Sequence, residues 1–138
     1  MSRTFTTVVE LQSGIESVCK TAVSEVAKIV CEKLQDLIYD DYYRQYIPKY
    51  YERTWQLFDA PEMNMLSSAL AEVFLNTGKM NYENMTGKFI AELSSQGFHG
   101  SKKIETEGHY WDDFLEWCEK NIPSLLKTSL REQGLFID

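Results

Sequence analysis

The sequence predicts an α+β fold, in which a long N-terminal helix packs on a small mixed or antiparallel sheet and C-terminal helices follow. Three observations support this prediction. A helical pattern fills the first third, short apolar runs separated by turn residues fill the middle, and helical periodicity rich in aromatic residues returns at the end. We expect a single domain with these parts: an arm, a strand or the entry to a helix (1–11), the long helix (12–46), a strand and turn region (47–93), a flexible loop (94–108) and the C-terminal helices (109–138).

The long helix is the clearest element of the sequence. Ser13 followed by Glu16 matches a capping box at its start. The helix must end before Pro48, because the residue that precedes a proline avoids the helical region. At about 1.5 Å per residue it is roughly 45–50 Å long, so we expect one end to project or the helix to bend. Its apolar stripe consists of Ile15, Val18, Ala22, Val26, Ile29, Leu34 and Leu37.

The middle third contains shorter patterns. Residues 62–78 fit a helix ended by Gly78, and they fit a strand with alternate residues on one face equally well, so both alternatives stay open. Residues 76–79 (Asn-Thr-Gly-Lys) are typical of a turn. Residues 88–93 (Lys-Phe-Ile-Ala-Glu-Leu) predict a strand. An irregular segment that we expect to be mobile contains Gly97, Gly100 and Gly108.

The last third predicts helix again. Pro123 is expected to end or kink the first helix, and a second one is expected from Ser124 to Gln133, with Gly134 as its C-cap. Carboxylates lie in the first turn, where they suit the positive end of the helix dipole. These carboxylates are Asp112, Asp113 and Glu116, and the accompanying aromatic stripe is Tyr110, Phe114 and Trp117.

The composition limits the classes of function. The net charge is −7, with 21 acidic and 14 basic residues. DNA-binding domains gain affinity by neutralising phosphates with Lys and Arg, so we expect no sequence-specific nucleic-acid binding. An acidic protein can still surround DNA that must slide past without sticking. No apolar run approaches the roughly 18 residues of a membrane span, and the N-terminus lacks the apolar core of a signal peptide. We therefore expect a protein made in the cytoplasm that contacts no membrane.

The three cysteines, Cys19, Cys31 and Cys118, are widely spaced and form no C-x-x-C pair. This pattern indicates neither a zinc site nor a disulfide framework. We expect free thiols that pack as small hydrophobic side chains.

Motifs for catalysis are weak. His99 and His109, with the nearby carboxylates of Asp112, Asp113 and Glu116, are the best candidates for a metal-dependent hydrolase. Their spacing matches no compact metal motif, and the carboxylates are already explained by the helix start. No phosphate-binding glycine loop and no G-x-S-x-G nucleophile motif occurs. We expect a protein without a cofactor or a metal that is not an enzyme.

A tyrosine cluster surrounds the predicted end of the long helix. It contains Tyr39, Tyr42, Tyr43, Tyr46, Tyr50 and Tyr51. These rings either fill the seam between helix and sheet, the interpretation we favour, or form an interface, where tyrosine supplies large contact area at low entropic cost. Arg53 follows them, and we expect it to bind free carbonyl groups or to pair with an acid such as Asp40 or Asp41.

The order of these segments resembles a known family. The long helix followed by Pro48-Lys-Tyr-Tyr51-Glu-Arg53-Thr54 and Leu57 is similar to small tail-completion and head–tail connector proteins of tailed phages and prophages. Three further segments extend the resemblance over residues 12–135. Trp55 departs from the family's pattern, because in that family a glycine often follows the Arg-Thr pair. The further segments are Gly78-Lys-Met80-Asn-Tyr82, Gly97-Phe98-His99-Gly100 with Tyr110-Trp111 and Phe114, and the closing helix from Leu126 to Gly134.

The resemblance implies an α+β subunit that assembles with copies of itself into a ring in the virion neck or upper tail. Neighbouring neck, adaptor, tail-terminator or tail-tube proteins would be its other partners, and DNA would pass through the ring. No catalytic residues accompany the resemblance. The interface residues we expect are Tyr50, Tyr51, Arg53, Trp55, Phe98 and His99. The alternative is a cytoplasmic acidic binding module, an inhibitor or adaptor of a bacterial host protein.

Overall fold

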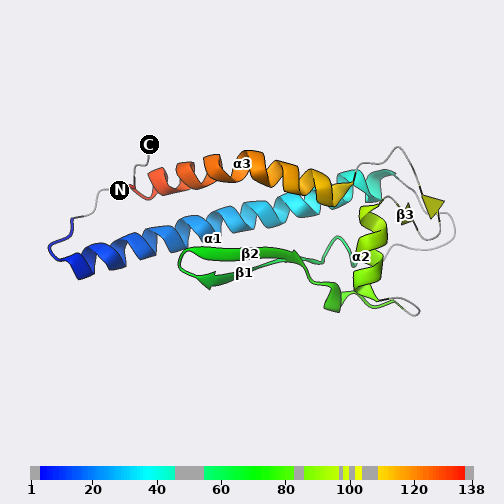
Figure 1. Ribbon diagram of the computed structural model, residues 1–138, viewed down its shortest axis with the longest axis horizontal. Helices are drawn as coiled ribbons and strands as arrows, with labels where there is room; N and C mark the ends of the chain where they lie inside the picture. The colour runs from blue at the N-terminus through cyan, green and yellow to red at the C-terminus, as the bar shows by residue number, and fades with distance from the viewer. Residues whose placement is uncertain are drawn as a thin grey trace.

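The computed structural model describes residues 4–45, 55–82, 86–96, 98–99, 102–103 and 109–135. It confirms the predicted α+β fold. The long helix α1 lies between the C-terminal helix α3 on one side and a β-hairpin on the other (Figure 1). In chain order the elements are α1 (Val8–Asp41), η1 (Tyr43–Gln45), β1 (Pro61–Ser67), β2 (Leu70–Leu75), η2 (Thr77–Lys79), α2 (Gly87–Ser95), β3 (Phe98–His99), β4 (Lys102–Lys103) and α3 (Tyr110–Glu132).

Helix α1 begins at Val8, before the predicted start at residue 12. The side chain of Thr7 caps the helix by accepting a 3.1 Å hydrogen bond from the backbone N–H of Glu10. The Glu10 carboxylate in turn accepts hydrogen bonds from the backbone N–H and the hydroxyl of Thr6. The capping box predicted at Ser13 and Glu16 is therefore wrong, because an earlier Thr-x-x-Glu sequence satisfies the free N–H groups first. Residues 8–11 are helical, and the helix ends at Asp41, before Pro48 as expected.

The core forms along one stripe of α1. Phe114 and Tyr110 of α3 are buried against it, and the Ser129 hydroxyl donates a 2.7 Å hydrogen bond to the Glu25 carboxylate. The contact between α1 and α3 is the largest between helices in the described part of the chain. The buried stripe consists of Val18, Ala22, Val26, Val30, Leu34 and Ile38, each four residues after the one before.

Strands β1 and β2 form an antiparallel hairpin, so the strand alternative is confirmed up to Leu75. Pro61 pairs with Leu75, and the register shifts between Met65 and Ser67. The exposed Glu72 agrees with the strand alternative. The turn predicted at residues 76–79 is confirmed as the short helix η2.

The strand predicted at residues 88–93 is wrong, because this segment belongs to helix α2. The Thr86 hydroxyl caps α2 by accepting a 3.2 Å hydrogen bond from the N–H of Phe89. The buried residues Gly87, Ala91 and Ser94 follow helical spacing, which six residues are too few to reveal.

The segment expected to be a loop, 94–108, begins inside α2 and contains the two-residue strands β3 and β4, paired with each other. Residues 97, 100–101 and 104–108 lie outside the described part of the chain. The expected mobility of this loop therefore stays a prediction.

Helix α3 runs through Pro123, so the predicted division into two helices is wrong. Pro123 lies on the exposed side, and Ile122, Leu125 and Leu126 pack on the core around it. This packing offsets the backbone hydrogen bond that proline cannot donate. The predicted C-cap is confirmed. Gly134 has a φ of 90°, and the N–H of Leu135 donates to the Leu130 carbonyl, as in a Schellman motif.

Candidate interaction surfaces

Five aromatic rings meet where α1 ends. We call Tyr39, Tyr42, Tyr43, Trp55 and Phe58 the aromatic cluster. Tyr43 and Trp55 stack with their centroids 4.7 Å apart, and Tyr39 stacks on Trp55 at 6.5 Å. Phe58 meets Trp55 edge to face at 6.1 Å. Such geometries are the preferred arrangements of aromatic pairs.

Hydrogen bonds fix the buried side of the aromatic cluster. The Phe58 N–H donates to the Tyr43 hydroxyl at 3.4 Å, and the Gln35 amide donates to the Phe58 carbonyl at 3.1 Å. Tyr43 is buried, whereas Tyr39 and Trp55 remain 44% and 39% exposed. The inner rings therefore fill the seam between helix and hairpin, and the outer two rings present an aromatic surface to solvent.

Trp55 combines a large side chain with a backbone conformation that suits glycine. Its φ is 60°, in the left-handed region that disfavours residues with a Cβ atom. This is the position where the sequence pattern departs from the usual glycine. Stacking against Tyr39 and Tyr43 holds the ring in place and compensates for the backbone strain.

The structure describes only part of the predicted interface. Tyr50, Tyr51 and Arg53 lie outside the described residues, and so does the predicted pairing of Arg53 with Asp40 or Asp41. Phe98 and His99 form β3, whose side chains are not described. Of the six predicted residues, Trp55 is the one whose surroundings are described. Asp40 lies 3.6 Å from Arg44 in an exposed ion pair.

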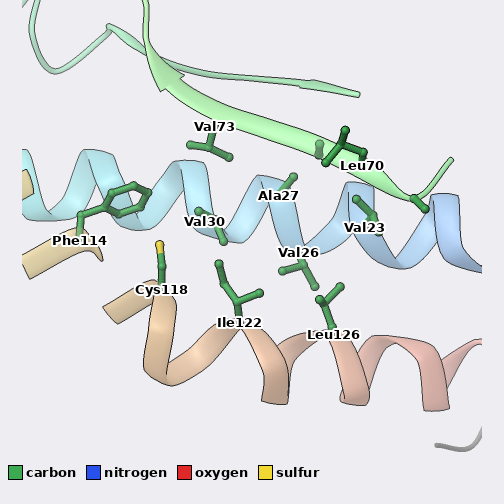
Figure 2. Close-up of a pocket in the computed structure, with 12 residues that line it drawn as sticks. Val23, Val26, Ala27, Val30, Leu70, Val73, Phe114, Cys118, Ile122 and Leu126 are labelled. Atoms are coloured by element: carbon green, nitrogen blue, oxygen red, sulfur yellow. The ribbon is translucent and has the colours of Figure 1, made fainter. Parts of the chain in front are cut away.

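A second surface is an open apolar groove of about 350 Å³ along α1 (Figure 2). Helix α1 forms its floor, the β2 side of the hairpin forms one wall, and α3 forms the other. Every side chain that lines it is apolar or a thiol. The floor residues are Val23, Val26, Ala27 and Val30, the hairpin contributes Ala69, Leu70, Ala71 and Val73, and α3 contributes Phe114, Cys118, Ile122 and Leu126.

This groove could not be predicted from the sequence. The sequence shows apolar residues on each of the three elements, but periodicity cannot show that side chains of opposing elements fail to meet. The small side chains of Ala27, Ala69 and Ala71 are the feature of the sequence that indicates a groove, because alanine leaves empty the volume that a larger residue would fill.

Two carboxyl groups meet where α1 ends and α3 begins. Burial raises the pKa of Asp41 to about 7, reinforced by a hydrogen bond and charge repulsion from Asp113 and by the charge of Asp40. Lys33 opposes the shift. Oδ2 of Asp41 is buried without a hydrogen-bond partner in the described part of the chain. Near neutral pH Asp41 is therefore partly protonated, whereas an isolated aspartate would have released its proton.

Comparison with known proteins gives the family of this chain. A family model, described as YomN, matches residues 7–132, from the cap of α1 to the last residue of α3. The chain belongs to the YomN family. YomN is a name associated with phages and prophages, in agreement with the phage association that the sequence resemblance implied. No curated protein and no solved structure matches the chain.

In this YomN-family protein, the described polar side chains near α3 serve local structure. Nδ1 of His109 lies 2.9 Å from the Ser95 carbonyl, and the buried Tyr110 hydroxyl lies 2.9 Å from the Ser94 hydroxyl. Burial raises the pKa of Tyr110 to about 12. Within the described ranges, no three His, Cys, Asp or Glu side chains gather as metal ligands. The His99 side chain lies outside these ranges.

The three cysteines are free thiols, each partly buried, as the sequence predicts. Burial raises the pKa of Cys31 and Cys118, which lowers the fraction of reactive thiolate at neutral pH. Among the described helices, none is long and apolar enough to cross a membrane.

Proposed function

We propose that this protein is a structural component of a tailed-phage or prophage particle. In this proposal it belongs to the neck or upper tail, where copies form a ring that joins the DNA-filled head to the tail. The open apolar groove is the observation that carries the proposal, because an amphipathic helix of a partner protein can place its apolar face in such a groove. The family's phage association supports the particle as the place where that partner is found.

The exposed part of the aromatic cluster supports a role in contact. Tyr39 and Trp55 present rings whose inner faces are already fixed by stacking, so a partner would not have to order them. Rigid aromatic side chains of this kind are enriched in protein interfaces. The proposed partners are copies of the same chain and neighbouring adaptor, tail-terminator or tail-tube proteins.

The net charge of −7 is compatible with a ring through which DNA passes. DNA repels an acidic lumen, and repulsion prevents the phosphate contacts that would slow its movement. The proposed ring acts through shape and contact, and it uses no cofactor and performs no reaction.

Deletion of the gene in an inducible prophage tests this proposal. We expect the lysate to contain filled heads and separate tails in place of joined particles, and we expect the wild-type gene to restore them. Mass spectrometry of purified wild-type particles should detect the chain, and immunogold electron microscopy should place it between head and tail. Normal particles from the deletion strain, or particles that lack the chain, would contradict the proposal.

A second candidate is an acidic module that inhibits or adapts a basic host protein, and the excess of acidic residues favours it. In that case the chain would be missing from purified particles and would bind a host protein in cells. The particle experiment therefore separates the two candidates.

A further inference from the structure

The free edge of strand β2 borders the apolar groove. Among the described strands, β2 pairs with β1 alone. The hairpin residues that line the groove belong to β2 or to the turn before it, and no residue of β1 lines it. Val73 of β2 lies between its strand and α1 (Figure 2). The edge of β2 that faces away from β1 therefore opens onto the groove.

The register of the hairpin shows which backbone groups lie on this free edge. Pro61 pairs with Leu75 but has no N–H to donate, so the two form a non-hydrogen-bonded pair. One pair further along, the Asn76 N–H donates a 2.8 Å hydrogen bond to the Ala60 carbonyl, as this pattern requires. The two kinds of pair alternate along an antiparallel ladder. Every second residue of β2 before Leu75 therefore directs its N–H and C=O groups away from β1.

These residues are Val73 and Ala71, which pair with Met63 and Met65. Within the described part of the chain, their outward N–H and C=O groups take part in no hydrogen bond. The side chains of the same two residues line the groove. An unpaired strand edge of this kind is a template for a further strand. One wall of the groove thus combines apolar side chains with free backbone donors and acceptors.

The two edges of the hairpin differ in how they are protected from pairing. Strand β1 begins with Pro61 and has a register shift between Met65 and Ser67. Prolines and β-bulges are features by which proteins prevent the addition of strands to a sheet. Strand β2 (Leu-Ala-Glu-Val-Phe-Leu) contains no proline and no lysine. The edge that borders the groove is therefore the edge without protection.

We propose that an extended segment of a partner protein pairs with β2 along the groove as a third strand. Its backbone bonds to Ala71 and Val73, and its alternate apolar side chains fill the groove against α1 and α3. A helix in the groove would leave the edge of β2 unpaired, whereas a strand uses both features. This inference rests on the proposed function and names the kind of segment by which a neighbour in the particle binds.

The charges beside the groove describe the partner segment further. Glu72 is exposed and lies on the face of β2 opposite to Val73, next to the outward side chains of an added strand. On the other wall, the exposed Glu119 follows the groove residue Cys118. Opposite charges on neighbouring strands stabilise their pairing. The partner segment therefore carries Lys or Arg between its apolar residues.

Two pools of labelled peptides, each about nine residues long, test the contact with the purified full-length protein. The strand pool has Val, Ile, Leu or Phe at odd positions and Lys or Arg at even positions. The helix pool has the same composition, with its apolar residues at the helical positions 1, 4, 5, 8 and 9. Fluorescence anisotropy measures binding. We expect the strand pool to contain peptides that bind at least about tenfold more tightly than any of the helix pool.

N-methylation of the tightest strand peptide tests the backbone pairing directly. Only every second N–H of an added strand faces β2. One version of the peptide is methylated at its odd nitrogens and the other at its even nitrogens. We expect one version to bind at least about tenfold more weakly, because several hydrogen bonds are lost, and the other to bind as the parent does.

Two protein variants, each with a matched control, locate the binding site. Ala71→Pro removes an outward N–H of β2, and Met65→Pro makes the same change on the outer edge of β1. Leu70→Lys places a charge on the groove wall that repels a basic peptide, and Leu66→Lys changes a similarly exposed residue that does not line the groove. Circular dichroism establishes that each variant is folded. We expect Ala71→Pro and Leu70→Lys to weaken peptide binding at least about tenfold, and the controls to keep it.

Three results would overturn this contact. They are a helix pool that binds as tightly as the strand pool or binding by neither pool, equal effects of the two methylation patterns, and equal binding by the variants and their controls. The proposed function fails differently, by absence of the chain from purified particles. A chain that is present in particles but binds no strand peptide would keep the function and remove the contact.

Discussion

Trp55 illustrates, at the scale of single residues, how side-chain packing fixes a backbone conformation that the residue itself disfavours. The left-handed φ of 60° suits glycine, and two stacked tyrosines hold the indole there. The sequence reveals the unusual residue at this position. It does not reveal the rings that compensate for it, because Tyr39 belongs to α1 and Tyr43 to η1.

Substitution of Trp55 separates the backbone strain from the stacking. Trp55→Ala and Trp55→Gly both lose the stacked rings, but alanine keeps the left-handed penalty and glycine does not. We therefore predict that the alanine variant is less stable than the glycine variant by about 1 kcal/mol, measured by urea unfolding. Tyr39 in α1 is the control, since in a helix glycine is less stable than alanine by about 1 kcal/mol. The same order at both positions would contradict the left-handed conformation of Trp55.

The carboxyl pair of Asp41 and Asp113 predicts a dependence of stability on pH. The pKa of Asp41 is raised to about 7 in the folded protein, against about 3.9 in an unfolded chain. Between these values the folded state binds more protons, so the free energy of unfolding falls as pH rises. The contribution of Asp41 is fully present below about pH 4 and is lost as pH passes through about 7.

Asp41→Asn should remove this decline and stabilise the protein at pH 8, with little effect at pH 4. Urea unfolding at intervals between pH 4 and pH 8 measures it. Asp112→Asn alters an exposed carboxylate in the same turn of α3 as Asp113 and is the control. A decline in the Asp41→Asn variant as steep as in the wild type would rule out the raised pKa.

Long and short helices differ in how well the sequence predicts them. The 34 residues of α1 repeat the apolar pattern many times, so the helix is predictable, and the core residues Val18, Ala22, Val26 and Leu34 are found from sequence. The nine-residue α2 is too short for its period to be recognised. Its cap at Thr86 is a local hydrogen bond to Phe89, whereas the close approach of Gly87 to η2 is a tertiary contact that the sequence does not show.

Gly87 provides a test of the packing of α2. A Cβ atom at Gly87 would lie 2.1 Å from the backbone oxygen of Thr77, so Gly87→Ala must displace η2. We predict a loss of about 1–3 kcal/mol, the usual cost of overpacking, seen as a lower thermal midpoint. A Cβ atom at Gly78 would lie 3.3 Å from the side-chain oxygen of Asn76, so Gly78→Ala should lower the stability less than Gly87→Ala does. Equal effects at the two glycines would show that α2 and η2 are not packed together in this way.

Pro123 is the corresponding test for α3. The proline removes a backbone hydrogen bond in the middle of a helix, yet its ring lies on the exposed side and makes no contribution to the core. Pro123→Ala should raise the free energy of unfolding by up to about 3 kcal/mol, measured in urea. Pro61→Ala at the start of β1 alters a buried residue outside any helix and should bring no such gain. Unchanged or reduced stability of Pro123→Ala would mean that the helix does not continue through this residue.

At the scale of the whole molecule, the placement of the elements explains why the groove could not be predicted from the sequence. In the sequence, α1, the hairpin and α3 each have an ordinary apolar face. The unfilled space between these faces depends on where the hairpin and α3 lie around α1. The same arrangement leaves Leu11 and Ile15, near the start of α1, partly exposed in a second hollow that Phe5 and residues 133–135 also line. A single chain thus ends with apolar surface at two places, which favours a role in assembly over a role as an isolated domain.

Cryo-electron microscopy of the particle neck tests this account most directly. We predict a ring in which α1, α3 and the hairpin of each copy can be fitted, with protein density filling the groove between β2 and α3. Particles that lack the chain, or a ring in which every groove faces solvent, would contradict the account.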